Sequence, residues 1–179
     1  MIRMKKILAI SGSLRKDSFN TKLVHSLQGI VGDTAEITIA EIGNLPLFNQ
    51  DLEATFPSEV QALKDTILAS DAIIFSTPEY NRSIPGVLKN AIDWASRPYG
   101  QNAFAGKPVL IIGTTIGTVG TALAQSHLKE ILLYLDMKVL GQPEIYISTV
   151  QDKVNKDTGM FDEDTIKHIQ VGIDKLLAM

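Results

Sequence analysis

The sequence contains no cysteine among its 179 residues. Without thiols the chain can form no disulfide, carry out no thiol redox chemistry and supply no thiolate ligands to an iron–sulfur cluster. Any redox chemistry that the protein performs must therefore come from a bound cofactor. The absence of cysteine also agrees with a cytoplasmic location, which is our expectation for this chain.

Long apolar runs and a strong charge of one sign are absent as well. No stretch approaches the roughly 20 apolar residues that are needed to cross a bilayer, and residues 7–10 are too few for the core of a signal peptide. The net charge of −3 gives no electrostatic reason to expect a nucleic acid or an anionic membrane as a partner. We therefore expect small molecules as partners, with no nucleic acid and no membrane.

The composition that is present is ordinary for a globular protein. Hydrophobic residues make up 45% of the chain and charged residues 21%, which is far from the composition of a disordered protein. We find no internal repeat, low-complexity tract or linker. The length and this uniformity predict a single domain over residues 1–179.

Short apolar runs alternate five times with helical patterns along the chain. The expected strands are residues 6–10, 35–40, 71–75, 107–113 and an interrupted segment within 138–147. Apolar residues recur at helical spacing over 21–30, 58–69 (with Ser58 as the N-cap), 86–97, 123–135 and 166–177. This alternation predicts a three-layer α/β sandwich around a parallel sheet, and five strands favour the flavodoxin-like order 2-1-3-4-5.

The expected strand order brings three loops together. Strands 1, 3 and 4 would lie side by side, so the loops after them would meet at the carboxyl edge of the sheet, where such folds bind ligands. These loops are residues 11–20, 78–85 and 114–120, and all three are rich in small, polar or glycine residues. We therefore expect the functional site at this edge.

The first of these loops has the groups that bind a phosphate monoester. A helix N-terminus, whose amides carry positive partial charge, follows a set of polar side chains: Ser11, Ser13, Arg15, Ser18 and Asn20. The loop is neither a P-loop nor a Gly-x-Gly-x-x-Gly dinucleotide loop, and it lacks the clustered carboxylates of a response regulator. Spacing alone leaves open the alternative of a capped helix beside a solvated arginine.

The second loop is bounded by two prolines. Pro78 ends the preceding strand, and Pro85 with Gly86 begins the next helix. Between them, residues 79–83 carry a carboxylate, a phenol, an amide, a guanidinium and a hydroxyl. Taken alone, such a loop would be interpreted as a surface turn, and its convergence with the other two loops is what favours a site.

Three stretches carry a resemblance to a known family: Gly12-Ser-Leu-Arg-x-x-Ser-Phe-Asn20, Pro78-Glu-Tyr-Asn81 and Ile84-Pro-Gly-x-Leu-Lys-Asn-Ala-Ile-Asp-Trp94. They resemble the signature segments of the NADPH-dependent FMN reductases. The loop 114–120, the pair His127-Leu and the segment 135–144 extend the likeness towards the bacterial chromate/quinone reductases. The resemblance covers nearly the whole chain.

The resemblance implies FMN as cofactor and assigns its site by position. The FMN phosphate would be held by Ser13, Arg15, Ser18, Phe19 and Asn20. The isoalloxazine ring would be lined by Pro78, Glu79, Tyr80 and Asn81. Its other side would be approached by Thr115 and Gly117, in a loop that departs from the Ser- and Gly-Gly-rich form of many relatives.

The family further implies an FMN-dependent NAD(P)H oxidoreductase. NADPH or NADH would pass a hydride to FMN, which would then reduce quinones, azo compounds or oxidised metal anions such as chromate. No side chain is expected to be catalytic, because the flavin carries the chemistry; Tyr80 and Arg82 are expected to shape the substrate site. We expect no metal site and, from the family, a homodimer or homotetramer that acts on small-molecule electron acceptors.

Two alternatives remain at this point. A flavodoxin-like electron carrier would also bind FMN but would not turn over NAD(P)H itself, and the third, weaker candidate is a non-redox nucleotide-binding module.

Two further residues are interpreted by their surroundings in the sequence. Trp94 is expected to pack within its helix layer rather than against the ring, and His127, in an apolar helix, is expected to be a packing or interface residue.

Overall fold

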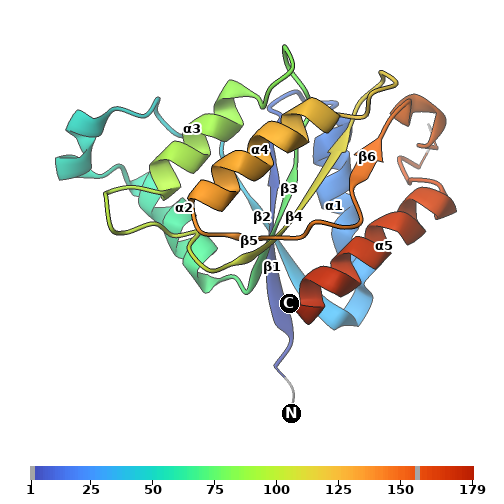
Figure 1. The fold of residues 1–179 in the computed structure, drawn as a ribbon, viewed down its shortest axis with the longest axis horizontal. Helices are drawn as coiled ribbons and strands as arrows, with labels where there is room; N and C mark the ends of the chain where they lie inside the picture. The colour runs from blue at the N-terminus through green and yellow to red at the C-terminus, as the bar shows by residue number, and fades with distance from the viewer. Residues whose placement is uncertain (1–2, 156–157) are drawn as a thin grey trace.

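A parallel sheet forms the centre of the computed structural model, which describes residues 3–155 and 158–179 (Figure 1). Its strands are β1 (Lys5–Ser11), β2 (Ala35–Ala40), β3 (Ala72–Ser76), β4 (Pro108–Thr114), β5 (Lys138–Val139) and β6 (Ile145–Ile147). They are hydrogen-bonded in the order β2-β1-β3-β4-β5, with β6 also paired to β4. The predicted flavodoxin-like fold and strand order are confirmed.

The predicted interrupted fifth strand is two short strands. β5 pairs with the beginning of β4, at Pro108 and Val109, whereas β6 pairs with its end, from Ile112 onward. Gly141 and Pro143 lie between the two strands, and a proline cannot donate the backbone hydrogen bond that a continuous ladder needs. The last position of the sheet is therefore shared by two segments.

In the described part of the chain, five α-helices cover the two faces of the sheet: α1 (Phe19–Val31), α2 (Ser58–Ala69), α3 (Gly86–Ala95), α4 (Ala122–Tyr134) and α5 (Glu163–Ala178). α1 and α5 pack on one face, and α2, α3 and α4 on the other (Figure 1). Along β1, Ile7 and Ala9 point into the core beneath α1 and α5, whereas Leu8 and Ile10 point into the core beneath α2, α3 and α4. Burial on both faces explains why the strands are continuous apolar runs in the sequence.

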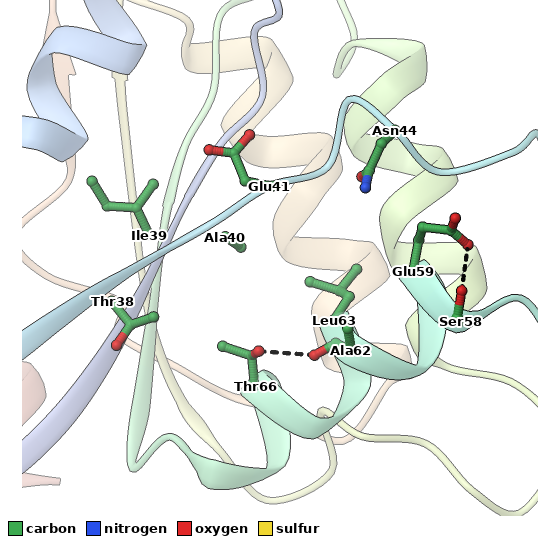
Figure 2. A pocket seen from close by; sticks show the side chains of 10 residues that line it. All are labelled: Thr38, Ile39, Ala40, Glu41, Asn44, Ser58, Glu59, Ala62, Leu63 and Thr66. Atoms are coloured by element: carbon green, nitrogen blue, oxygen red, sulfur yellow. Dashed lines mark hydrogen bonds between the residues drawn. The ribbon is translucent and has the colours of Figure 1, made fainter.

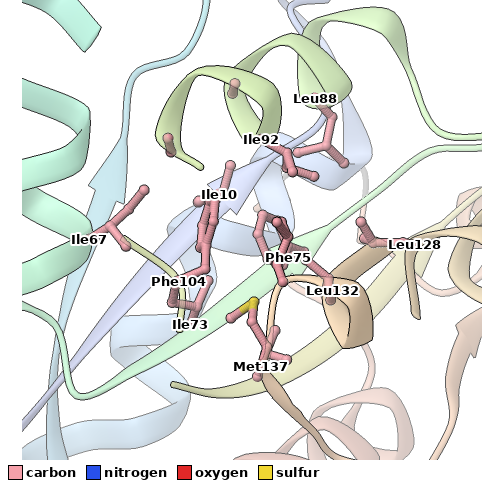
Figure 3. Close-up of a cluster of buried hydrophobic side chains, with 14 of the residues drawn as sticks. Ile10, Ile67, Ile73, Phe75, Leu88, Ile92, Phe104, Leu128, Leu132 and Met137 are labelled. Atoms are coloured by element: carbon pink, nitrogen blue, oxygen red, sulfur yellow. The ribbon is translucent and has the colours of Figure 1, made fainter. Parts of the chain in front are cut away.

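The core beneath α2, α3 and α4 contains the larger side chains. Phe75 of β3 lies among residues from three helices in Figure 3, and its ring centre is 6.2 Å from that of Phe104. Leu88, Leu128 and Phe104 are almost completely removed from solvent. This core holds α3 and α4 next to the ends of β3 and β4, and so positions the loops between these elements.

The helix boundaries correct two expectations. Ser58 is not the N-cap of α2: Pro57 occupies the cap position, and the Ser58 hydroxyl donates to Glu59 instead, at 3.2 Å. α3 ends at Ala95 rather than near Arg97. Arg97 precedes a proline, and a residue before proline disfavours the helical conformation.

Trp94 packs inside the helix layer, as predicted. Its side chain is fully buried, with the rings of Phe48 and Phe56 edge-on at 5.0 and 5.5 Å. Its indole nitrogen donates to the Pro46 carbonyl at 2.8 Å. These contacts fasten the long loop before α2 onto α3.

No described helix is long and apolar enough to cross a membrane.

Candidate functional site

The loops after β1, β3 and β4 meet at the carboxyl edge of the sheet, as the strand order predicts (Figure 1). The Gly12 amide donates to the Ser76 carbonyl at 2.8 Å, which joins the first loop to the end of β3. A Cβ on Gly12 would lie 3.2 Å from Leu88 and 3.3 Å from Pro78. The first and second loops are thus packed closely together, and only a very small residue fits between them.

Asn20 joins all three segments at this edge. Its buried side-chain amide donates to the Thr114 carbonyl at 3.0 Å, while its carbonyl oxygen accepts from the Thr114 amide at 3.0 Å and the Ser76 hydroxyl at 2.9 Å. These bonds connect α1 to the ends of β3 and β4. Because the side chain is buried and bonded to β3 and β4, the group that Asn20 offers a ligand is its backbone amide.

The first loop presents hydroxyl donors in front of α1. Ser18 is the N-cap of α1, its oxygen accepting from the Thr21 amide at 3.3 Å. The Ser13 oxygen accepts from the Arg15 amide, also at 3.3 Å. A serine hydroxyl that accepts one bond still has its proton to donate. Ser13 and Ser18 therefore keep two O–H donors at the start of the helix.

Amides and a cation complete this donor set. The amides of Phe19 and Asn20 belong to the first turn of α1, where the backbone has no intrahelical acceptor. Arg15 is exposed, and its guanidinium donates to the Asp17 carbonyl at 2.8 Å with further N–H groups to spare. Hydroxyls, helix-terminal amides and a guanidinium are the groups that bind a phosphate monoester, so the donor set fits the phosphate of FMN.

The second loop uses its carboxylate to hold a helix. One Glu79 oxygen accepts from the amides of Leu123 and Ala124, at 3.0 and 3.1 Å. These amides begin α4, whose own N-cap residue, Thr121, makes no side-chain capping bond. Glu79 thus caps a helix 44 residues away, and its side chain is only 12% exposed. The groups that it can offer a ligand are those of its backbone.

A tight turn follows Glu79. The amide of Tyr80 donates to the Ser83 carbonyl and the amide of Ser83 to the Tyr80 carbonyl, both at 3.0 Å. The two residues between them are left-handed, with φ of 51° at Asn81 and 65° at Arg82, as in a type I′ turn. Asparagine tolerates this conformation, but arginine at φ > 0 was not foreseeable from the sequence. The turn exposes Tyr80 and Arg82 to solvent.

The third loop is held by the segment after β6. The amides of Thr149 and Val150 donate to the carbonyls of Gly117 and Thr115, both at 3.1 Å. The Gly117 amide donates to the Thr115 hydroxyl at 3.2 Å. Thr115 is half-buried and Gly117 exposed. The loop therefore has a defined shape in which Gly117 lets another group approach its backbone closely.

The sequence analysis did not predict the exposed apolar side chains at this edge. Each of the three loops carries a large apolar side chain in solvent: Leu14 in the first, Tyr80 in the second, Ile116 and Val119 in the third. Apolar side chains around a few placed polar groups are typical of sites for flat organic ligands. A signal was available, because these residues break the polar character of otherwise small and polar loops.

The Tyr146 phenol and the Thr114 hydroxyl lie directly behind the site. Gly120, at φ +71°, leaves room for the backbone and Cβ of Tyr146. Burial raises the pKa of Tyr146 to about 12, and the neighbouring Glu144 carboxylate adds to the effect. The phenol is therefore neutral across the physiological range. The Thr114 hydroxyl is buried without a hydrogen-bond partner among the residues described.

A cleft that lies elsewhere, between β2 and α2, is shown in Figure 2. It measures about 480 Å³, and none of the predicted site residues lines it. In residues 3–155 and 158–179, no group of three or more His, Asp or Glu side chains could hold a metal ion. The predicted site residues instead all lie on the three loops and the first turn of α1.

Known proteins resemble this chain over most of its length. The model of the NADPH-dependent FMN reductase family matches residues 5–152. A 2-hydroxy-1,4-benzoquinone reductase of Burkholderia sp. is 46% identical, covering 97% of this chain and 94% of its own, and the quinone reductase of Escherichia coli K12 is 41% identical, covering 92% and 89%.

A solved structure agrees with these relatives. FerB, a flavoenzyme NAD(P)H:(acceptor) oxidoreductase from Paracoccus denitrificans, superimposes with a TM-score of 0.90 at 46% identity, covering 97% of this chain and 96% of its own. The family match, the identities and the fold agree with the donor set at the carboxyl edge. The chain therefore belongs to the NADPH-dependent FMN reductase family, and it is an oxidoreductase that works with FMN and a nicotinamide co-substrate.

Proposed function

We propose that this protein is an NAD(P)H-dependent quinone reductase whose FMN lies at the carboxyl edge of the sheet. One observation carries the proposal: the phosphate donor set of α1 stands next to three convergent loops that each expose an apolar side chain. The relatives named as quinone reductases support quinones as acceptors. Azo compounds and oxidised metal anions such as chromate are further candidate acceptors.

The FMN phosphate would be held at the start of α1. The hydroxyls of Ser13 and Ser18 and the amides of Phe19 and Asn20 would donate to its oxygens, and the Arg15 guanidinium would balance its charge. The isoalloxazine would be lined by the backbone of Pro78, Glu79 and Asn81 with the Tyr80 side chain, and approached by Thr115 and Gly117. The rigid contacts of these loops favour binding because little order has to be created.

When bound, FMN would accept a hydride from NADPH or NADH and pass the electrons on to the acceptor. The residues of the chain bind and orient the reactants, and none is required as an acid or base, since water can protonate a reduced quinone. Alternating use of one open site by nicotinamide and acceptor predicts ping-pong kinetics.

Arg82 is our candidate for attracting anions to the site. Its guanidinium lies 3.4 Å from Glu79 but remains 68% exposed, so it can still form a two-pronged contact with an oxyanion. The partner could be the 2′-phosphate of NADPH, an anionic acceptor or a carboxylate of a second subunit. Replacing Arg82 with alanine should raise KM for NADPH more than for a neutral quinone, and added salt should narrow the difference.

Anaerobic mixing with NADPH tests the function directly. A reductase should lose its oxidised-flavin absorbance within seconds and regain it on addition of a quinone. A flavodoxin-like carrier would keep its absorbance until a separate reductase is added, and that result would refute the proposal. A preparation without flavin absorbance that also fails to take up added FMN would refute the cofactor site.

We also propose a single domain that assembles as a homodimer or homotetramer in the cytoplasm. The family resemblance supports the assembly, and the uniform composition supports the single domain. Light scattering coupled to size-exclusion chromatography would measure the mass in solution against 19.5 kDa for one chain. A monomer at micromolar concentration would contradict the expected assembly.

A further inference from the structure

A histidine on α4 contacts the loop that carries Tyr80 and Arg82. The His127 Nδ1 atom lies 2.9 Å from the Ser83 hydroxyl oxygen, a hydrogen bond between residues 44 positions apart. His127 is exposed, and it lies on α4, outside the three loops of the site. Water could satisfy the ring nitrogens of an exposed histidine, so the bond to Ser83 indicates a role other than packing.

The same helix holds the other end of the turn. Glu79, four residues before Ser83, accepts from the amides of Leu123 and Ala124. Those amides are at the N-terminus of α4, and His127 follows them by three and four residues, about one turn further along the same helix. Residues 79 and 83 are therefore both attached to the first turns of α4, one through a carboxylate and the other through a hydroxyl.

The turn between these attachments is unfavourable by itself. Asn81 and Arg82 both have φ > 0, a conformation that asparagine tolerates but that is costly for arginine. Such residues persist only where the surrounding structure holds them. The two backbone bonds between Tyr80 and Ser83 close the turn but do not orient it relative to the sheet. The contacts to α4 supply that orientation.

We infer that His127 is a positioning residue that orients the turn 80–83 through Ser83, and so places Tyr80 and Arg82 at the substrate side of the site. This role rests on the proposed function. It predicts that loss of the bond affects the use of the acceptor more than the retention of FMN, because the phosphate donors belong to α1. His127 itself has no assigned contact with cofactor or substrate.

The geometry allows a rescue experiment. An asparagine can place an amide near the position of Nδ1, and an amide can accept from or donate to a hydroxyl, whichever role the imidazole has. We would therefore compare His127→Ala, His127→Asn and Ser83→Ala. The matched control is His168→Ala, which removes another exposed histidine, on α5, that bonds a neighbouring segment at the Glu144 carbonyl, 3.1 Å away.

The first measurement needs no turnover. Amide hydrogen exchange of the FMN-loaded proteins should be about fivefold faster at Tyr80 and Ser83 in His127→Ala and Ser83→Ala, as expected for the loss of one hydrogen bond. His127→Asn should restore most of the protection, and His168→Ala should leave it unchanged. The double variant His127→Ala/Ser83→Ala should resemble either single variant, because both remove the same bond.

The second measurement is kinetic. KM for a neutral quinone should rise about fivefold in His127→Ala, with FMN affinity changed less than twofold, and His127→Asn should recover the KM. Unchanged exchange at Tyr80 and Ser83 in an active His127→Ala enzyme would overturn the positioning role alone. A wild type that reduces no quinone would instead refute the proposed function, and the positioning role with it.

Discussion

The cleft between β2 and α2 and the carboxyl edge of the sheet differ in what they offer a ligand. The cleft measures about 480 Å³, but the hydroxyls of Ser58 and Thr66 on its wall donate to neighbouring groups of α2 (Figure 2). The loop edge has a helix N-terminus, two buried serine hydroxyls and backbone held in fixed turns. Prearranged donors, rather than open space, distinguish a binding site from a surface depression.

Topology explains the difference. β1, β3 and β4 are internal strands whose following loops are pressed against one another, whereas β2 is at the end of the sheet and, among the strands described, pairs with β1 alone. A loop with neighbours on both sides has its backbone oriented by them. The cleft beside β2 has no such second neighbour, so its side chains are not directed towards a common point.

The largest expected effect comes from filling space behind the loop edge. A Cβ at Gly113 would lie 2.1 Å from the Thr121 hydroxyl and 2.5 Å from the Thr77 carbonyl. Gly113→Ala should therefore lower the free energy of unfolding by about 3 kcal/mol, at the upper end for overpacking, and weaken FMN binding. Urea denaturation measures this loss. Gly141→Ala, with no atom within 4 Å of the new Cβ, is the control and should change stability by less than about 1 kcal/mol.

The next effect concerns the phosphate. Arg15→Ala should weaken FMN binding by about 2–3 kcal/mol, as for the loss of a charge-assisted bond. Riboflavin, which lacks the phosphate, should lose much less. Fluorescence titration of both flavins measures the difference, and equal losses would remove Arg15 from the phosphate site. In the cleft, Glu41→Ala should leave both affinities unchanged, and a loss there would break the contrast between the two regions.

The next prediction compares two carboxylates at helix N-termini, Glu79 at the loop edge and Glu59 beside the cleft. Glu79 caps α4 from another segment, with its side chain 12% exposed, whereas Glu59 is an exposed residue in the first turn of α2 that accepts from Ser58. Glu79→Ala should cost about 1–2 kcal/mol of stability, the usual range for a lost cap, and Glu59→Ala about 0.5 kcal/mol or less. Thermal unfolding of the two variants tests the ranking; equal shifts in Tm would contradict it.

The smallest expected effect is that of replacing Asp71, which lies at the opposite, amino edge of the sheet. The backbone amide of Lys6 lowers the pKa of Asp71, and the ion pair with Arg3 adds to this. A carboxyl whose folded pKa is lowered contributes stability above its unfolded pKa, near 3.9, and loses it as the pH falls through the folded pKa.

Asp71→Asn should therefore cost up to about 1 kcal/mol at pH 7, since the group is partly exposed. The difference from wild type should shrink below about pH 4, as the wild-type carboxyl becomes protonated. Urea denaturation at pH 7 and pH 3 checks the sign. FMN affinity should stay unchanged, because the substitution is at the edge away from the loops; a weakened flavin would show that the two edges are coupled.

The sequence was sufficient to predict the layers and the meeting of three loops at the carboxyl edge of the sheet. Apolar runs at 6–10 and 71–75 predict buried strands because burial on both faces demands apolar residues throughout, and the strand order then follows from alternation and strand number. Pro78, Pro85 and Gly86 mark loop boundaries through constraints that each residue carries by itself. Local chemistry thus determined where the loops are and which donors they hold.

Only the tertiary structure decided which of those groups remain free for a ligand. Asn20, predicted as a phosphate ligand, has its side chain bonded to Thr114, 94 residues away, and Glu79 has its side chain on α4. Ser83 and His127 are paired although nothing in their sequence spacing indicates contact. Periodicity and capping preferences act over a few residues, whereas these hydrogen bonds form only after the sheet and its helices bring distant segments within 3 Å, so the folded arrangement alone determines them.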